Sequence, residues 1–341
     1  MRIGIDARKI ADFGIGTYIR GLLGGLVALD NGDELVAFAP ASAAIPARIE
    51  HIVVDAPHYS ARELITLGRA ANRAKLDVFH APHYVVPFTR VPIVVTIHDL
   101  IHLHQRMRNP LAPLYARAML RRAVKRARCV LTVTETVKAQ LETELGAKNV
   151  IVTPNGVTIP ATADRRLPTA DSFPDYFLYV GNDKPHKNVD TLIDAFARVR
   201  SEIPDIRLVL AGGAFERFRT RDGVEARGFV SDDELSALYR SAIALVMPSI
   251  EEGFGLPAAE AMAHGTAVIA STAPALVEVT GEAALHIDAR DPSALASAML
   301  RVARDGDLRA MLGANGIERA RFFTWKRCAE LTRDAYRIAA S

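Results

Sequence analysis

Short apolar runs rich in β-branched residues alternate with longer amphipathic stretches along this chain of 341 residues, and the alternation constrains the fold more than any other feature. Each run is long enough for one strand, and each amphipathic stretch is long enough for one helix. Strand–helix–strand repetition builds parallel sheets with helices packed on their faces. The sequence therefore predicts an α/β protein.

The alternation occurs twice. In the first series we expect strands at Arg2–Asp6, Glu34–Phe38, Ile52–Val54, Val78–His80, Ile93–Ile97, Cys129–Val133 and Val150–Val152, with helices at Thr17–Leu29, Ala61–Ala74, Pro113–Arg126 and Thr136–Leu145. In the second we expect strands at Tyr176–Val180, Arg207–Ala211, Val224–Arg227, Ala244–Pro248 and Ala267–Ala270, with helices at Asn188–Ile203, Ser231–Ser241, Pro257–His264 and Pro292–Val302.

The stretch between the two series contains Pro160, Pro168 and Pro174 and has no periodic apolar pattern, which predicts a linker over residues 159–175. A chain of this length also exceeds the size at which one hydrophobic core stops growing. We therefore expect two Rossmann-like domains, at residues 1–158 and 176–323. A last helix within 324–341 has an apolar face that needs a partner surface, and the cleft between the two domains is the expected active site.

Charge is unevenly distributed: residues 1–150 have a net charge of +7 and the remainder −4. Between Leu100 and Thr134 there are eight Lys and Arg residues and no Asp or Glu. A basic amphipathic helix in this segment, 106–128, can rest on an anionic membrane surface, attract an acidic acceptor, or be an ordinary solvated face. Nucleic acid is not an expected partner, because aromatic residues do not interleave with the basic ones and the overall charge is small.

The sequence contains only two cysteines, Cys129 and Cys328, which cannot form a disulfide framework or a four-thiolate zinc site. This low cysteine content fits a reducing compartment. No apolar run approaches the ~20 residues of a membrane span, and the first residues do not resemble a signal peptide. We expect a cytoplasmic protein that acts at the inner face of the cell membrane if the basic segment contacts lipid.

The segment with the strongest functional signal is Glu252-Gly253-Phe254-Gly255-Leu256-Pro257-Ala258-Ala259-Glu260, which follows an expected strand and opens an expected helix. The two glycines let the backbone approach a ligand closely, and the free N–H groups of a helix start favour a phosphate. The two glutamates are spaced so that one can face a sugar and the other a ribose. A bare pair of glutamates at this spacing would more simply indicate a solvated turn.

Further candidates follow other strand ends, where open α/β sheets bind ligands. Lys187, beside His186, is a point charge placed at a helix entry for a diphosphate. His98 follows an expected strand, with Asp99 beside it to orient the ring. The loop Gly14-Ile15-Gly16-Thr17, before the first helix, suits a phosphate or an acceptor hydroxyl.

Two alternative chemistries have weaker support. The Gly14 loop lacks the third glycine of a dinucleotide-binding fingerprint, because Ile19 stands there, which argues against a dehydrogenase. The histidines and aspartate at 98, 99, 102 and 104, and the D-x-D pattern Asp305-Gly306-Asp307, contain metal-ligand residue types. Nothing else in the sequence demands a metal, so we expect none.

These segments, in this order, resemble the retaining glycosyltransferases of family 4 (glycosyl transferases group 1), which have the GT-B fold and an E-x7-E signature. The resemblance covers nearly the whole chain and includes Gly14–Tyr18, Thr96–Leu100, Val133–Thr136, Pro154–Val157, Val180–Asn188, Leu208–Gly212, Gly228–Ser231 and Glu252–Glu260. Thr134 departs from a frequent Ser, and His186 from a frequent Arg.

The resemblance implies two Rossmann-like domains facing a central cleft, with the nucleotide sugar bound by the C-terminal domain, the acceptor bound by the N-terminal domain, and the last helix crossing back to the N-terminal domain. It implies that Glu260 binds the ribose and that Glu252, with the N–H groups of Phe254 and Gly255, binds the donor sugar. Lys187 would stabilise the departing diphosphate without a metal or cofactor, and His98 would contact the sugar or its phosphate. The remaining donor-site residues would be Gly181, His186, Gly228, Phe229, Val230, Gly253 and Leu256.

By the same resemblance, the expected reaction is transfer of a sugar with retention of configuration, in the synthesis of a surface polysaccharide such as lipopolysaccharide. GDP-mannose is the first candidate donor and a UDP-linked sugar the second; the acceptor would be a glycan or a lipid-linked oligosaccharide. Two other functions stay open at this point. One is a GT-B sugar-nucleotide epimerase, and the other is a non-catalytic subunit that binds nucleotide sugar.

Overall fold

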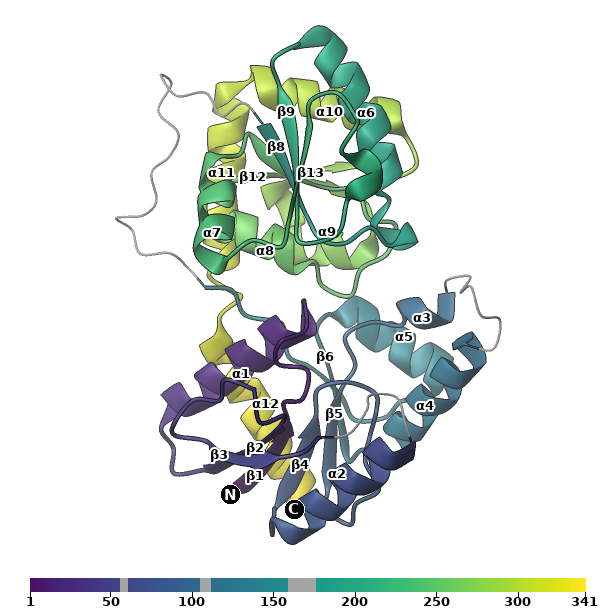
Figure 1. Ribbon diagram of the computed structural model, residues 1–341, viewed down its shortest axis with the longest axis vertical. Coiled ribbons are helices and arrows are strands. Elements are labelled where there is room, and N and C mark those ends of the chain that lie inside the picture. Colours follow the sequence, from purple (N-terminus) through teal and green to yellow (C-terminus); the bar gives the residue numbers. More distant parts are fainter. Residues whose placement is uncertain (56–60, 105–111, 159–175) are drawn as a thin grey trace. The chain divides into compact units, whose positions relative to one another are not determined.

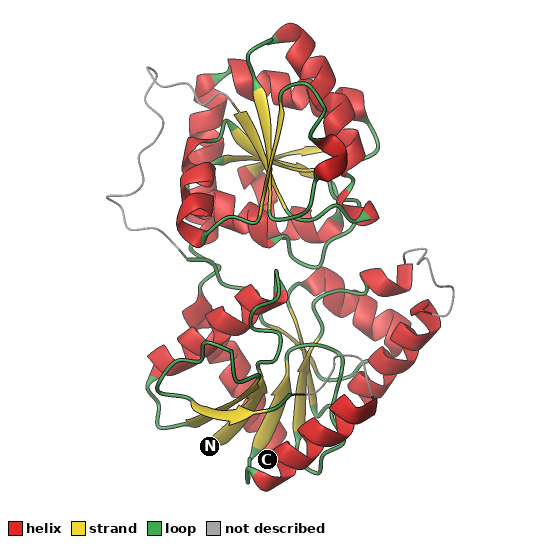
Figure 2. Cartoon of the chain, viewed as in Figure 1, coloured by secondary structure: helices red, strands yellow, loops and turns green. Residues whose placement is uncertain are grey.

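The computed structural model describes residues 1–55, 61–104, 112–158 and 176–341. It divides into two compact units: Met1–Gly156 together with Trp325–Ser341, and Val157–Thr324 (Figure 1). The expected linker, 159–175, lies outside the described residues, as do residues 106–111 of the basic segment. Within each unit, helices pack around a central sheet (Figure 2).

The first unit contains a seven-stranded sheet in the order β3-β2-β1-β4-β5-β6-β7, and every pair of neighbours is parallel. Its strands are β1 (Arg2–Asp6), β2 (Glu34–Ala39), β3 (Glu50–Val53), β4 (Val78–Ala81), β5 (Ile93–Thr96), β6 (Cys129–Thr132) and β7 (Val150–Val152). Its helices are α1 (Ile15–Leu29), α2 (Ala61–Arg73), α3 (Ile101–His104), α4 (Ala112–Arg126), α5 (Glu135–Leu145) and α12 (Trp325–Ala340).

Helices cover both faces of this sheet, because its central strands are apolar on both sides. One core combines α1 and α12 with one face of the strands, and residues of α2, α4 and α5 form the core on the other face. The two faces therefore have separate cores, and most of β1, β4 and β5 is buried between them.

Helix α12 belongs to the first unit although it comes last in the chain, and it lies beside α1 (Figure 1). Polar bonds fix it at several points: the Tyr336 hydroxyl lies 2.7 Å from His80 Nδ1, and Arg333 pairs with Asp33 at 2.6 Å. His80 is fully buried, and this burial lowers its pKa to about 3. The helix thus bonds to a neutral histidine inside the sheet.

The second unit contains a six-stranded parallel sheet in the order β10-β9-β8-β11-β12-β13. Its strands are β8 (Tyr176–Val180), β9 (Arg207–Ala211), β10 (Val224–Gly228), β11 (Ala244–Met247), β12 (Ala267–Ser271) and β13 (Ala284–Ile287). Its helices are α6 (Val189–Glu202), α7 (Asp232–Ser241), α8 (Leu256–Ala263), α9 (Pro274–Thr280), α10 (Pro292–Arg304) and α11 (Gly306–Ala320). One core is formed by the sheet with α6, α10 and α11.

The two parallel α/β sheets confirm the predicted fold class. The sequence analysis missed β13, α9 and α11 in the second unit and the short α3 in the first. It also assigned Ile15 and Gly16 to a loop, whereas α1 begins at Ile15.

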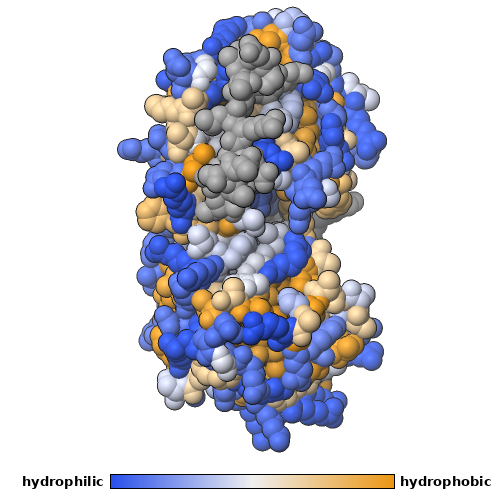
Figure 3. Space-filling view, turned by 90° about the vertical axis from the view of Figure 1, so that its left-hand side faces the viewer, coloured by the Kyte–Doolittle hydropathy of each residue, from blue (hydrophilic) through white to orange (hydrophobic). Residues whose placement is uncertain are grey.

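No helix within the described ranges is long and apolar enough to cross a membrane. Hydrophilic residues cover most of the face seen in Figure 3, with smaller apolar patches between them. Apolar side chains gather instead in the cores described above.

Candidate active site

Strand order places the candidate residues of the second unit. The chain moves outward from β8 through β9 to β10, then returns to the other side of β8 and continues from β11 to β13. The order therefore reverses between β8 and β11, and ligands of open α/β sheets bind beyond the carboxyl ends of the strands at such a reversal. The loops that follow β8 and β11 contain Lys187 and Glu252.

These two residues form an ion pair, with Lys187 Nζ 2.7 Å from Glu252 Oε1. Their side chains are 16% and 7% exposed, so the pair is shielded from water but still reachable. The second oxygen of Glu252 has no hydrogen-bond partner among the described residues. The structure thus brings together two of the residues expected at the site, with acceptor capacity left for a ligand hydroxyl.

Backbone and amide bonds fix the two loops relative to each other. Ile250 N–H donates to the carbonyl of the buried His186 at 2.7 Å. Asn188 donates from Nδ2 to the carbonyls of Pro248 and Ala289, and its Oδ1 accepts from Thr191. The Lys187–Glu252 pair is therefore held by a network that joins three segments of the sheet edge.

The glycine-containing turn before α8 presents backbone donors. Gly255 precedes α8 with φ = 88°, a left-handed conformation that glycine adopts without steric cost. The N–H groups of Phe254, Gly255 and Leu256 donate to no other described residue. The Phe254 ring is buried edge-on against Phe323, 5.3 Å between centroids, so this residue can offer a ligand only its backbone.

Glu260 is the fifth of the eight residues of α8 and accepts a hydrogen bond from the buried Tyr239 hydroxyl at 2.7 Å through Oε2. Burial raises the pKa of the Glu260 carboxyl, and the tyrosine bond acts in the opposite direction. Its other oxygen has no partner among the described residues. Glu260 is half-buried and keeps one acceptor for a ligand. The sequence analysis missed Tyr239, because no local pattern links positions 21 residues apart.

The remaining donor-site candidates lie at neighbouring strand ends. Gly181 directly follows β8, and Gly228 ends β10, where its carbonyl accepts from Gly212 N–H at 2.6 Å. Phe229 is next, and its side chain is 77% exposed. An exposed aromatic ring at the carboxyl edge of the sheet is a surface on which a base can stack, and Val230 is half-buried beside it.

In the first unit, the residues expected to form a phosphate loop surround the start of α1. Gly14 precedes the helix, and Ile15, Gly16 and Thr17 form its first turn rather than a loop. The N–H groups of Ile15 and Gly16 already donate to Phe13 and Asp12. Of these three first-turn residues, only Thr17 has an N–H without a bond to another described residue, so the turn offers fewer donors than its sequence indicated.

His98 follows β5, and Nε2 lies 3.1 Å from the carbonyl of Pro82, a contact in which that nitrogen is the donor. Burial lowers the pKa of His98 to about 4, so the ring is neutral near pH 7 and Nδ1 is an acceptor. Tyr18 packs edge-on against it at 4.6 Å. Asp99 bonds to the Ile101 N–H instead of the ring, so Pro82 and not Asp99 orients His98.

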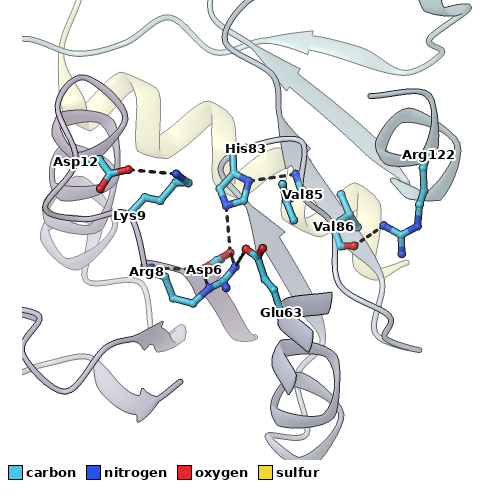
Figure 4. A network of polar contacts seen from close by, with 9 residues as sticks. All are labelled: Asp6, Arg8, Lys9, Asp12, Glu63, His83, Val85, Val86 and Arg122. Atoms are coloured by element: carbon cyan, nitrogen blue, oxygen red, sulfur yellow. Dashed lines mark hydrogen bonds and ion pairs between the residues drawn. The ribbon is translucent and has the colours of Figure 1, made fainter. Parts of the chain in front are cut away.

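A buried ionic cluster in the first unit was not expected from the sequence (Figure 4). Arg8 contacts Asp6 at 2.7 Å and Glu63 at 2.8 Å, and His83 lies 3.4 Å from Asp6. Burial acts to raise the pKa of Asp6, but the guanidinium of Arg8 outweighs it and holds that pKa well below its usual range. The cluster spans the β1 and β4 ends, where the strand order of this sheet also reverses.

Residues of the two sequence patterns that contain metal-ligand residue types have other partners. His104 pairs with Glu144 at 3.0 Å, and Asp305 caps α11 by accepting from Leu308 N–H. Across the described ranges, no group of three or more His, Cys, Asp and Glu side chains is placed to hold one metal ion.

The family models divide the chain much as the two units do. Residues 14–159 match the family described as glycosyltransferase family 4, and residues 162–319 match glycosyl transferases group 1. Together these matches leave only the chain ends and two residues between them uncovered.

Relatives and solved structures agree with these matches. O-antigen chain mannosyltransferase B of Escherichia coli is 29% identical over 76% of this chain and 74% of its own length. The structure of sucrose-phosphate synthase from Thermosynechococcus elongatus has a TM-score of 0.81 at 24% identity, covering 99% of this chain and 98% of that one. Anabaena HepE, solved in complex with UDP and glucose, has a TM-score of 0.75 at 18% identity and covers 98% of each chain. This chain belongs to the glycosyltransferases of family 4 and group 1 and has their GT-B fold.

Proposed function

We propose that this glycosyltransferase transfers a sugar from a nucleotide donor bound by the second unit, with retention of configuration and without a metal. The observation that carries the proposal is the Lys187–Glu252 pair, at the reversal of strand order and near the Phe254, Gly255 and Leu256 N–H groups, which donate to no described residue. A cation and free N–H groups suit a diphosphate, while the spare carboxylate oxygen suits a sugar hydroxyl.

Each residue has a distinct role in the proposed reaction. The free oxygen of Glu260 accepts from a ribose hydroxyl, because Tyr239 already occupies the other. Glu252, with the N–H groups of Phe254 and Gly255, holds the hydroxyls of the donor sugar. Lys187 stabilises the charge that develops on the diphosphate as it leaves, which is electrostatic catalysis. His98, a neutral acceptor in the first unit, contacts the transferred sugar.

For the substrates we propose GDP-mannose as donor and a growing surface glycan or a lipid-linked oligosaccharide as acceptor, bound by the first unit. The mannosyltransferase name of the Escherichia coli relative supports mannose. The UDP and glucose bound by HepE make a UDP-linked sugar the second candidate. Action in the cytoplasm, with the basic segment 106–128 against an anionic membrane, stays a prediction.

Thermal unfolding in the presence of UDP, GDP, ADP and their sugars tests the donor site. A ligand that binds only the folded protein raises the melting temperature. We expect one nucleotide family to stabilise the protein, Glu260→Ala to reduce that response strongly, and Glu260→Gln, which still accepts from Tyr239, to reduce it partly. Glu282→Ala removes an exposed carboxylate of the same unit and is the control. An unchanged response in Glu260→Ala would refute the ribose role.

A turnover assay separates transfer from the two alternative functions. We expect nucleotide release from the stabilising donor only when an acceptor glycan is supplied. Release without acceptor would indicate an epimerase or a hydrolase, and donor binding with no release under any condition would indicate a binding subunit.

A further inference from the structure

A basic pocket lies between α2 and α4 in the first unit, and no residue assigned to the reaction lines it. Its volume is about 640 Å³, and it is open to solvent. Five of the eight residues that line it are cationic and none is acidic: Asn72, Phe88, Thr89, Arg90, Arg121, Arg122, Lys125 and Arg126.

No described residue neutralises the positive charge in this pocket. None of the five cations forms an ion pair with a carboxylate in the described part of the chain. Arg122 Nη2 is buried and has no hydrogen-bond partner there. Burial, together with the neighbouring charge of Arg126, lowers the pKa of Arg122. A buried guanidinium donor beside like charges is costly unless an anion accepts from it.

The walls of the pocket are fixed. The loop Val86–Arg90 passes so close to α2 that a Cβ on Gly68 would lie 2.0 Å from the Phe88 carbonyl oxygen. Asn72 Oδ1 accepts from the Thr89 hydroxyl and from Arg90 N–H, and Arg126 donates to the Thr89 carbonyl at 2.8 Å. Rigid walls hold the cations near one another before any ligand binds.

Arg122 joins the loop to α4. Its Nη1 donates to the Val86 carbonyl (Figure 4), and its guanidinium lies 4.4 Å from the centre of the half-exposed Phe88 ring. Arg122 Nη1 thus fixes the loop, whereas Arg122 Nη2 donates to no described residue.

The pocket lies at the opposite edge of the sheet from His98. Arg90 precedes the first residue of β5, and Arg126 precedes the first residue of β6, whereas His98 follows the last residue of β5. The pocket therefore borders the amino end of β5, whereas His98 follows its carboxyl end. Its ligand is not the sugar that His98 is proposed to contact.

We infer that this pocket binds a phosphate group, either of a soluble phosphate ester or of a lipid headgroup. The guanidinium groups of Arg90, Arg121 and Arg122 and the ammonium of Lys125 supply charge-assisted hydrogen bonds to the phosphate oxygens. The Asn72 amide nitrogen, which has no partner among the described residues, adds a neutral donor.

Two double variants of the full chain, matched in charge, test this inference. Arg121→Ala with Lys125→Ala removes two exposed lining cations that make no hydrogen bond to other described residues, so the loop keeps its anchors. Arg117→Ala with Arg128→Ala removes two exposed cations of the same segment that do not line the pocket. The probes are inorganic phosphate and glycerol 1-phosphate, titrated at constant ionic strength, and flotation with phosphatidylglycerol vesicles compared with phosphatidylcholine vesicles.

We expect saturable binding by the wild type and the Arg117/Arg128 variant, and a loss of about tenfold or more in affinity in the Arg121/Lys125 variant. Loss in the titrations identifies a soluble ester, whereas loss only in flotation identifies a headgroup. Equal weakening by both double variants would show attraction to overall charge, and phosphate binding retained by the Arg121/Lys125 variant would place it elsewhere; either result overturns the inference. So does the absence of binding to every probe. None of the four substituted residues is proposed to bind the nucleotide, so we expect both variants to keep the stabilisation by nucleotide, and failure of this test would leave the proposed function untouched.

Discussion

The Lys187–Glu252 pair shows at the scale of single residues how the site combines opposite charges. The two residues are 65 positions apart in the chain, and their side chains meet because β8 and β11 are neighbours. The ion pair places two opposite charges together at a position of limited exposure. The pair therefore holds a cation and a carboxylate in one fixed geometry, which suits the proposed contacts to the diphosphate and the sugar.

Replacing Lys187 by Ala should lower kcat more than it changes the KM for donor, because its charge is needed most as the diphosphate leaves. A loss of roughly 10²–10³-fold in kcat is the usual cost of removing one such stabilising group. Steady-state kinetics with Lys184→Ala as control measure this, since Lys184 is an exposed lysine of the same loop. A Lys187→Ala enzyme with unchanged kcat would contradict the role.

Donor binding should weaken on acidification at a higher pH than an ordinary glutamate would cause. The raised pKa of Glu260 means that the folded protein protonates this carboxyl first, and protonation removes the negative charge that strengthens its bond to a ribose hydroxyl. The same shift means that Glu260 costs stability as pH rises through its folded-state pKa. The pH dependence of the nucleotide Kd checks this, and Glu260→Gln should lack that part of the dependence.

The sequence was sufficient to choose the residues of the candidate site but not their partners. Glu252, Lys187 and Glu260 stood out by position after strands and by resemblance. The Tyr239–Glu260 bond and the pairing of Arg8 with Asp6 and Glu63 join residues whose proximity depends on packing. Asp99 was expected to orient the His98 ring because it is adjacent in the sequence. Adjacent side chains point in different directions, however, and the carbonyl of Pro82 orients the ring instead.

At the scale of elements, the turn between β11 and α8 determines where the N–H groups proposed to bind the donor lie. Gly255 adopts φ = 88° there, and a Cβ on it would lie 2.4 Å from Leu276 Cδ2. The left-handed turn ends the loop and starts α8 with the Gly255 and Leu256 N–H groups unbonded to any described residue. Any other residue would strain this junction.

Gly255→Ala should destabilise the second unit by about 1–3 kcal/mol, the usual cost of a non-glycine residue in this conformation. It should also reduce the stabilisation by nucleotide, since the turn shifts. Gly306→Ala, at an exposed position where glycine has no positive φ, is the control and should be close to neutral. Denaturant unfolding measures both; equal stability of the two variants would show that the turn is not strained.

Strong periodicity decided which elements the sequence could predict. The central strands and long helices such as α6 and α10 were expected close to their observed positions. Helix α9 has only seven residues and α11 contains three glycines, which lower helix propensity, so both lacked a helical signal. Strand β13 has only four residues, lies at the sheet edge and includes the polar His286, so its apolar run is too short to stand out.

At the scale of the whole molecule, the chain uses the same strand order twice. Each sheet reverses direction next to its first strand, so each unit has one natural place for a ligand. In the second unit the Lys187–Glu252 pair occupies that place. In the first unit the Asp6–Arg8–Glu63 cluster lies there, with His98 at the end of the next strand. The repeated architecture therefore carries chemically different groups of charged residues at the two equivalent places.

The central claim is that the edge of the second sheet, at Lys187 and residues 252–260, holds an activated sugar. A crystal structure of the protein with the nucleotide sugar that raises its melting temperature most tests this directly. We expect the diphosphate within hydrogen-bond distance of Lys187 Nζ and the ribose on Glu260. A donor bound elsewhere, with Lys187 still paired only to Glu252 and residues 252–260 free of ligand contacts, would contradict the account.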